Sequence, residues 1–227
     1  MRRARALLLA TLACVASHVH ADSEINVDGS VLPTRTNVSI LVLSGSLRRL
    51  SSNSAIARAA VACSPFMVMA PRLDSLPFFD ADIEVPLPES VAVLRKLAFG
   101  ADAFWFSTPE YNSATSAVLK NAVDWLSRGG PENVSPLKGK PFTIASAGGG
   151  SGGMRAQVNV KAIVQDSGMV HVGSTSRLPP LAIKLWDGTQ RFSPETGDLV
   201  DPPTLTHVQS LVSELIDAAK SARRRDD

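Results

Sequence analysis

The sequence alternates between short, continuous apolar runs and longer segments with helical periodicity. Four apolar runs cover residues 38–43, 66–69, 103–107 and 142–146. Nearly every position of a run is apolar, which is typical of strands buried on both faces rather than of half-exposed strands. Such strands belong to parallel sheets that helices cover on both sides. This pattern constrains the fold more than any other feature of the chain.

The intervening segments have the spacing of amphipathic helices. The segment 116–128 places apolar residues three or four positions apart, so that they share one face: Val118, Leu119, Ala122, Val123 and Leu126. The same reasoning predicts helices over 54–63, 90–99, 154–166 and 204–222. A short fifth strand is expected at 170–172. The segments 70–88 and 178–203 are rich in Pro, and we expect them to be irregular.

Alternating strands and helices predict an α/β fold, a flavodoxin-like doubly wound five-stranded parallel sheet of order 2-1-3-4-5 with helices on both faces. The domain is expected over 37–222, after a leader and linker over 1–36 and before a charged tail over 223–227. Ligands of this topology bind beyond the carboxyl ends of the first and third strands, where the winding reverses.

Composition excludes several kinds of function. Hydrophobic residues make up 44% of the chain and charged residues 19%, as in soluble globular enzymes. The net charge of +2 is small, and much of the basic charge lies at the two ends, so nucleic acid is not expected as a partner. The two cysteines, Cys14 and Cys63, do not form a disulfide framework. No histidine or cysteine outside the leader has the spacing of metal ligands, so no metal site is expected.

Residues 1–21 resemble a targeting segment. Three arginines precede an apolar stretch over 6–16, small residues follow, and no acidic residue occurs before Asp22. This favours a secretory signal peptide, with entry into an organelle such as the mitochondrion as the second possibility and an unprocessed tail as the third. The apolar stretch is shorter than the roughly 20 residues of a membrane span, so no stable span is expected after removal of the leader.

The loop after the first strand has the residues of a phosphate site. It offers hydroxyls at Ser46 and Ser51, an amide at Asn53 and a guanidinium at Arg48, and it leads into a helix. Helix amino ends bind phosphate through free N–H groups, and Arg48 would add charge-assisted hydrogen bonds. The loop matches neither the P-loop nor the G-x-G-x-x-G pattern. The alternative is a capped helix with exposed arginines.

Two further loops follow buried strands. Residues 109–112 form the loop after the third strand and include Tyr111, the only tyrosine of the chain. The alternative for this loop is a polar turn with one half-exposed aromatic side chain. A glycine-rich run over 148–153 lies between the fourth strand and a helix, where glycines let the backbone approach a flat ligand.

Three blocks together resemble the NADPH-dependent FMN reductase family. The first is Ser44-Gly45-Ser46-Leu47-Arg48 with Ser51 and Asn53. The second is Pro109-Glu110-Tyr111-Asn112, followed by the helical sequence over 119–128. The third is Gly152-Gly153 with Arg155-Ala156-Gln157. The resemblance covers about 38–172, and the blocks occur in order, each at the end of an expected strand.

The resemblance implies an FMN enzyme that takes two electrons from NADPH or NADH and passes them, by a ping-pong mechanism, to a small-molecule acceptor such as a quinone or a flavin. Hydride moves directly between nicotinamide and flavin, so no catalytic side chain is expected. The expected FMN ligands are Ser46, Arg48, Ser51 and Asn53 for the phosphate, Pro109, Glu110, Tyr111 and Asn112 for the ring, and Ser146, Gly148 and Gly149 for its other edge.

The resemblance also implies a homodimer or homotetramer, with the helix that carries Leu119, Val123 and Trp125 at the interface. One departure from the family pattern is that residues 113–117, Ser-Ala-Thr-Ser-Ala, replace its usual Gly-Ser-Ile-Pro-Gly. Two alternatives stay open. One is an FMN-binding electron carrier, which the net positive charge and Arg48 disfavour, and the other is a non-enzymatic flavodoxin-like binding protein.

Overall fold

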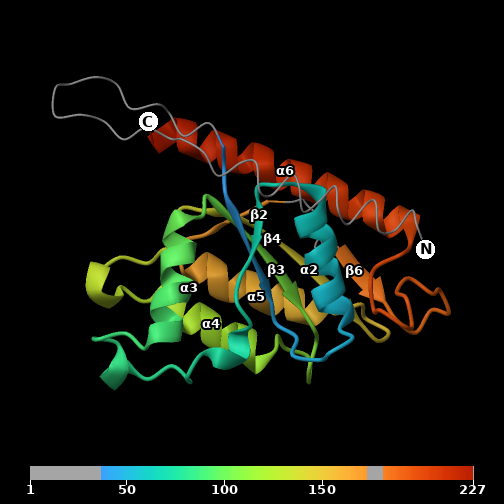
Figure 1. The fold of residues 1–227 in the computed structure, drawn as a ribbon, viewed down its shortest axis with the longest axis horizontal. Coiled ribbons are helices and arrows are strands. Elements are labelled where there is room, and N and C mark those ends of the chain that lie inside the picture. Colours follow the sequence, from blue (N-terminus) through green and yellow to red (C-terminus); the bar gives the residue numbers. More distant parts are fainter. Residues whose placement is uncertain (1–36, 173–180, 227) are drawn as a thin grey trace. The chain divides into compact units, whose positions relative to one another are not determined.

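The strands form one parallel sheet at the centre of the molecule (Figure 1). The structure is a computed structural model that describes residues 37–172 and 181–226. Their sheet has the order β2-β1-β3-β4-β5, and β6 also pairs with β4. The strands are β1 (Ile40–Ser44), β2 (Met67–Met69), β3 (Ala103–Thr108), β4 (Pro141–Gly148), β5 (Val170–His171) and β6 (Leu181–Lys184). The predicted order 2-1-3-4-5 is confirmed.

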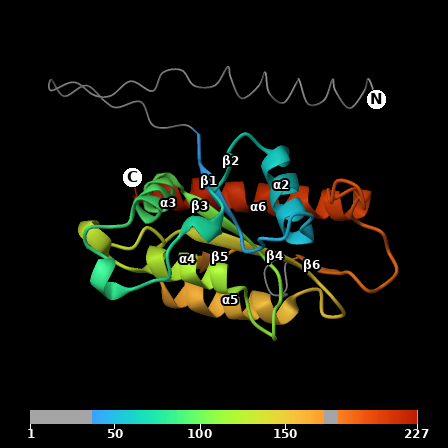
Figure 2. The same cartoon turned by 60° about the horizontal axis from the view of Figure 1, so that its bottom comes forward.

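Helices cover both faces of this sheet. They are α2 (Ser52–Cys63), α3 (Glu89–Gly100), α4 (Ala117–Ser127), α5 (Met154–Asp166) and α6 (Pro202–Asp226), with short 3-10 turns at Leu73–Ser75, Ala81–Ile83 and Gly130–Glu132. Figure 2 shows α2 and α6 on one side of the sheet and α4 and α5 on the other. Within the described residues, no helix is long and apolar enough to cross a membrane.

The alternation of side chains along each strand divides the core into two clusters. In β1, Ile40 and Val42 face α2 and α6, whereas Leu41 and Leu43 face α3, α4 and α5. In β3, Trp105 packs on the first side and Phe104 and Phe106 on the second. Every residue of β3 is buried. Burial of each large side chain contributes about 2–3 kcal/mol, so the continuous apolar run is explained by two buried faces.

The fifth position of the sheet differs from expectation. β5 pairs with Pro141 and Phe142 at the start of β4, and β6 pairs with 145–148 at its end. Two short strands therefore share this position, and the prediction that 178–203 is mostly irregular was wrong over Leu181–Lys184. Four residues are too few for a clear period, and the pairing with β4 makes this segment a strand.

The structure also corrects the expected role of α4. Leu119, Val123 and Trp125 are at most 2% exposed within the single chain. The segment before α3 covers this helix, because the carbonyl oxygen of Pro77 accepts hydrogen bonds from Asn121 Nδ2 and Trp125 Nε1, both at 2.9 Å. These three apolar side chains belong to the core of the chain and not to a subunit interface.

The chain ends also bear on the predicted domain limits. The leader predicted over 1–36 lies outside the described residues. Helix α6 continues to Asp226, so residues 223–226 of the predicted tail belong to its last turns. The family-like part begins at Val38, where the compact unit starts.

Candidate functional site

The carboxyl ends of β1, β3 and β4 bring three loops to one edge of the sheet. The loop after β1 is held against the start of α4. Gly45 N donates to Ser107 O at 2.8 Å, and a Cβ atom at Gly45 would lie 2.6 Å from Ser116 Oγ. Only glycine fits this contact, which brings the first and second loops of the site together.

The same loop leads into the amino end of α2. Ser51 caps the helix by accepting from Ser54 N at 3.1 Å, and Ser54 Oγ lies 2.9 Å from Ser44 Oγ. Ser46 is partly exposed and Arg48 is exposed, whereas Ser51 is buried. Free N–H groups and the helix dipole make this end suitable for an anion. Ser46 and Arg48 are therefore the predicted phosphate ligands whose side chains are accessible.

Asn53 has a different position from the one expected of a phosphate ligand. Its side chain is 5% exposed and bonds twice to Ala147 of β4, donating to the carbonyl at 3.0 Å and accepting from the amide at 2.8 Å. The amide group thus joins α2 to β4. Because Oδ1 and Nδ2 both bond to Ala147 and the side chain is buried, the backbone N–H of Asn53 is the group best placed to contact a phosphate.

Glu110 connects the second loop with the third. Pro109 is buried, and the Glu110 carboxylate accepts from Ser151 Oγ at 3.0 Å, Arg155 N at 3.0 Å and Arg155 Nη1 at 3.2 Å. The Arg155 amide belongs to the first turn of α5, where a carboxylate also complements the helix dipole. Glu110 therefore fixes the distance between the two loops.

Tyr111 and Asn112 lie at the exposed tip of a tight turn. Tyr111 and Ala114 exchange two backbone hydrogen bonds of 3.0 Å, and Asn112 and Ser113 have φ values of 51° and 66°. These are the features of a two-residue type I′ turn. Although residues 113–117 depart from the family pattern, the turn closes, and Ser116 caps α4 by accepting from Leu119 N. The Tyr111 side chain is 55% exposed.

The glycine-rich loop is supported from below by Ser146. This side chain is fully buried; its Oγ donates to Gly152 O at 2.6 Å and accepts from Gln157 Nε2 at 2.7 Å. Ser146 thus shapes the loop rather than presenting its hydroxyl to a ligand. A Cβ atom at Gly148 would lie 2.9 Å from Gly153 N, whereas one at Gly150 would have no neighbour within 4 Å. The loop is closely packed at its base and open at its tip.

Comparison with known proteins decides what these loops belong to. A model of the NADPH-dependent FMN reductase family matches residues 38–179. This chain belongs to that family. It is 33% identical over 185 residues to an NADPH:quinone oxidoreductase of Arabidopsis thaliana, covering 78% of this chain and 90% of the relative. It is 33% identical over 177 residues to a quinone reductase of Escherichia coli K12, covering 74% and 88%.

A solved relative has the same fold. FerB, a flavoenzyme NAD(P)H:(acceptor) oxidoreductase from Paracoccus denitrificans, superposes with a TM-score of 0.67 at 26% identity. The match covers 82% of this chain and 98% of FerB. The shared fold is flavodoxin-like.

The residues of this FMN reductase fit the cofactor in the family's name. The amino end of α2, with Ser46 and Arg48, suits a phosphate dianion. The Tyr111 side chain is exposed and the glycine-loop tip at Gly150 is open, so a flat ring can approach the backbone there closely. Across the described part of the chain, no group of three or more His, Cys, Asp or Glu side chains is arranged to hold a metal ion.

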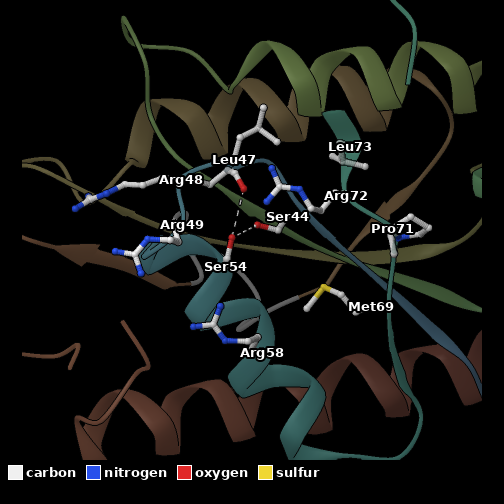
Figure 3. A pocket seen from close by; sticks show the side chains of 12 residues that line it. Ser44, Leu47, Arg48, Arg49, Ser54, Arg58, Met69, Pro71, Arg72 and Leu73 are labelled. Atoms are coloured by element: carbon white, nitrogen blue, oxygen red, sulfur yellow. Dashed lines mark hydrogen bonds between the residues drawn. The ribbon is translucent and has the colours of Figure 1, made fainter. Parts of the chain in front are cut away.

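Two features of this edge were missed by sequence reasoning. Trp186, just after β6, is 83% exposed. Its ring packs against Gly149, where an added Cβ atom would lie only 2.7 Å from the nearest ring atoms. A pocket of about 230 Å³ lies between the β1 loop, α2 and the segment after β2 (Figure 3). Arg49, Arg58 and Arg72 line it together with Ser46 and Arg48. Arg58 lies in the following helix α2 and Arg72 beyond β2, and no local pattern marks either of them.

Proposed function

We propose that this protein is an FMN-dependent NAD(P)H oxidoreductase that passes two electrons to a quinone, a flavin or a similar small acceptor by a ping-pong mechanism. The observation that carries the proposal is the meeting of three family loops, 44–53, 109–112 and 148–153, at one edge of the sheet. The names of the relatives from Arabidopsis and E. coli support quinones as the first acceptors to test.

Each loop has a separate task in this proposal. The amino end of α2, with Ser46 and Arg48, holds the FMN phosphate, and the Asn53–Ala147 bonds keep α2 in register with β4. Pro109 to Asn112 and the Gly148–Gly149 backbone hold the two edges of the ring. The bound FMN supplies the hydride and electron chemistry. The chain contributes orientation and leaves Tyr111 and the glycine-loop tip accessible to the two substrates in turn.

A spectroscopic experiment on the purified protein tests the proposal. We expect a flavin spectrum that bleaches when NADPH or NADH is added without oxygen and returns when a quinone is added. A flavin-containing protein that reacts with neither nicotinamide would instead be an electron carrier. A protein that cannot be loaded with FMN would be a binding protein of the same fold, and the proposal would be wrong.

We further propose that the protein forms a homodimer or homotetramer. Phe78 and Val85 are 81% and 67% exposed in the segment over 77–88, which packs beside α4, and exposed apolar side chains of this size are suited to contact with a second copy. Light scattering on wild type and on Phe78→Asp gives the test: a monomeric wild type would contradict the proposal.

The cellular location is also a proposal. The leader sequence favours secretion or endomembrane entry, with an organelle such as the mitochondrion second. Sequencing the amino terminus of the protein isolated from its own cells, together with fractionation, separates these. A cleaved chain in a secretory compartment is expected, and an intact amino terminus would contradict both locations.

A further inference from the structure

The arginine-lined pocket lies on the far side of the β1 loop from the proposed ring site. Its lining comes from the end of β1 and the following loop, from α2, and from the segment 69–73 after β2. The ring site is built by the loops after β3 and β4. In the sheet, β1 lies between β2 and β3, so the loop after β1 separates the two sites. The pocket shares Ser46 and Arg48 with the predicted site of the FMN phosphate, so the two sites adjoin at the β1 loop.

Positive charge accumulates around this pocket. Arg58 pairs with Asp198 at 2.7 Å and Arg72 with Asp74 at 2.6 Å, and both pairs are substantially exposed. Among the described residues, neither Arg48 nor Arg49 has an ion-pair partner. The first turn of α2 contains no acidic residue. Arginines beside the positive end of a helix weakly repel that end, and an anion bound among them would remove the repulsion.

The arginines lie on two sides of the pocket. In Figure 3, Arg72 extends from the segment after β2 toward Leu47, whereas Arg49 and Arg58 lie on the other side, at the β1 loop and α2. Ser44, Ser46 and Ser54 also line the pocket, together with apolar side chains such as Leu47, Met69 and Leu73. The hydroxyls of Ser44 and Ser54 lie 2.9 Å apart and bond to each other. Guanidinium groups pair best with phosphate and carboxylate oxygens, and a phosphate monoester carries close to two charges.

The size of the pocket limits what it holds. Sites for whole drug-sized ligands measure roughly 300–1,000 Å³. At about 230 Å³, this pocket accommodates a phosphate group and part of a sugar rather than a dinucleotide. The remainder of such a ligand would extend across the β1 loop toward the ring site. NADPH carries a 2′-phosphate monoester, and NADH lacks it.

We propose that Arg49, Arg58 and Arg72 form a second phosphate-monoester site, distinct from the site of the FMN phosphate, and that the 2′-phosphate of NADPH occupies it. The site gives the enzyme its preference for NADPH over NADH. This inference rests on the proposed reductase function. Arg48 stays with the FMN phosphate. Arg49 has no ion-pair partner among the described residues, and the ion pairs of Arg58 and Arg72 with their aspartates use Nε and Nη2 and leave Nη1 of each guanidinium for the ligand.

Coenzyme kinetics on the full FMN-loaded chain test the site. We would measure kcat/KM for NADPH and for NADH with one quinone, in wild type, Arg49→Ala, Arg72→Ala and Arg72→Lys. Loss of one charge-assisted phosphate contact lowers the NADPH-to-NADH ratio about 10-fold in each alanine variant. Arg72→Lys retains the charge and recovers part of the ratio. Arg224→Ala, an exposed arginine near the end of α6, is the matched control and leaves the ratio unchanged.

Binding of nucleotide fragments separates the possible sources of the phosphate. We expect adenosine 2′-monophosphate to bind the protein more tightly than adenosine 5′-monophosphate or inorganic phosphate, and to lose this advantage in Arg49→Ala and Arg72→Ala. Equal binding of all three would overturn the assignment to NADPH. Unchanged NADPH-to-NADH ratios would overturn the site itself.

The flavin content of the same variants completes the test. If Arg49→Ala and Arg72→Ala release FMN while the coenzyme ratio is constant, the pocket belongs to the FMN phosphate and the second site is refuted. If wild type cannot be loaded with FMN, the proposed function fails, but calorimetry with adenosine 2′-monophosphate on the FMN-free protein still decides between the presence and absence of the pocket's site.

Discussion

Arg95 of α3, which packs against the carboxyl end of α4, differs from the arginines just before α2 in how many of its hydrogen-bond donors the chain itself satisfies. Arg95 is 1% exposed, and its two terminal nitrogens donate to four carbonyl oxygens and to Glu132. Arg48 and Arg49 are exposed and, among the described residues, form no ion pair. Arg95 completes the fold, whereas the other two have donors left for a ligand.

The surroundings explain this difference. Arg95 meets the negative end of α4, where the carbonyls of Trp125 and Arg128 lack helical partners, so the cation and the helix end stabilise each other. Arg48 and Arg49 lie at the positive end of α2, and their charges repel that helix end in the FMN-free protein. The same residue type is thus structural at one helix end and suited to an anion at the other.

The largest expected effect comes from Arg95→Ala. Four buried or partly buried carbonyls and Glu132 would lose their donor, and we expect the free energy of unfolding to fall by about 3–5 kcal/mol. Urea unfolding measures this. Arg95→Lys keeps the charge but not the planar guanidinium, so its free energy of unfolding should lie between those of wild type and Arg95→Ala. A fully stable Arg95→Ala would mean that Arg95 does not hold the loop 128–134 together.

Arg48→Ala should weaken FMN binding and leave the stability of the protein nearly unchanged. We expect the dissociation constant of FMN to rise about 10- to 100-fold, because a charge-assisted phosphate contact is lost. The free energy of unfolding of the FMN-free protein should change by less than about 0.5 kcal/mol, as for most exposed substitutions. Fluorescence titration with FMN and urea unfolding give the two values. A large loss of stability with normal FMN binding would remove the contrast with Arg95.

His171, at the opposite edge of the sheet, is a basic side chain that the fold favours in its neutral form. It packs edge-on against Phe142, and burial together with the charge of Lys161 lowers its pKa to about 4. Between pH 4 and 6.5 the unfolded state binds more protons at this residue, so stability is complete above about pH 6.5 and falls as the pH decreases toward 4.

Because His171 is partly exposed, the expected loss over this range is about 1–2 kcal/mol. Thermal unfolding of wild type and of His171→Phe measures it, and the variant should lose this part of the pH dependence. The corresponding substitution of the exposed His207 is the control. If both variants keep the wild-type profile, His171 is not the group that titrates.

The smallest expected effect is an increase in the free energy of unfolding. Ser113 has a φ of 66°, in the left-handed region that non-glycine residues occupy at a cost of about 1 kcal/mol. Ser113→Gly should raise the free energy of unfolding by about 0.5–1 kcal/mol, less the entropy that glycine adds to the unfolded chain. Ser213→Gly, in the exposed middle of α6, should have the opposite sign. Equal effects of the two would mean that the turn is not strained.

The local periodicity of the sequence was enough to predict most of the fold. Continuous apolar runs gave β1, β3 and β4 their two buried faces, and three- and four-residue spacings located α3, α4 and α5 within about one residue. The segment Leu181–Lys184 was missed because its strand structure depends on pairing with β4 and not on its own pattern. The extension of the last helix to Asp226 was missed because its end is charged rather than apolar.

By itself, the sequence determined the doubly wound sheet, the family and the three loops at the edge of the sheet, because periodicity and short motifs are local properties. Tertiary structure alone decided how the side chains are used. It buried Asn53 against Ala147 and Ser146 beneath the glycine loop, and it turned Leu119, Val123 and Trp125 into the core. It also brought Arg72 to the pocket that Arg49 and Arg58 line, because contacts between residues distant in the chain depend on how helices and strands pack.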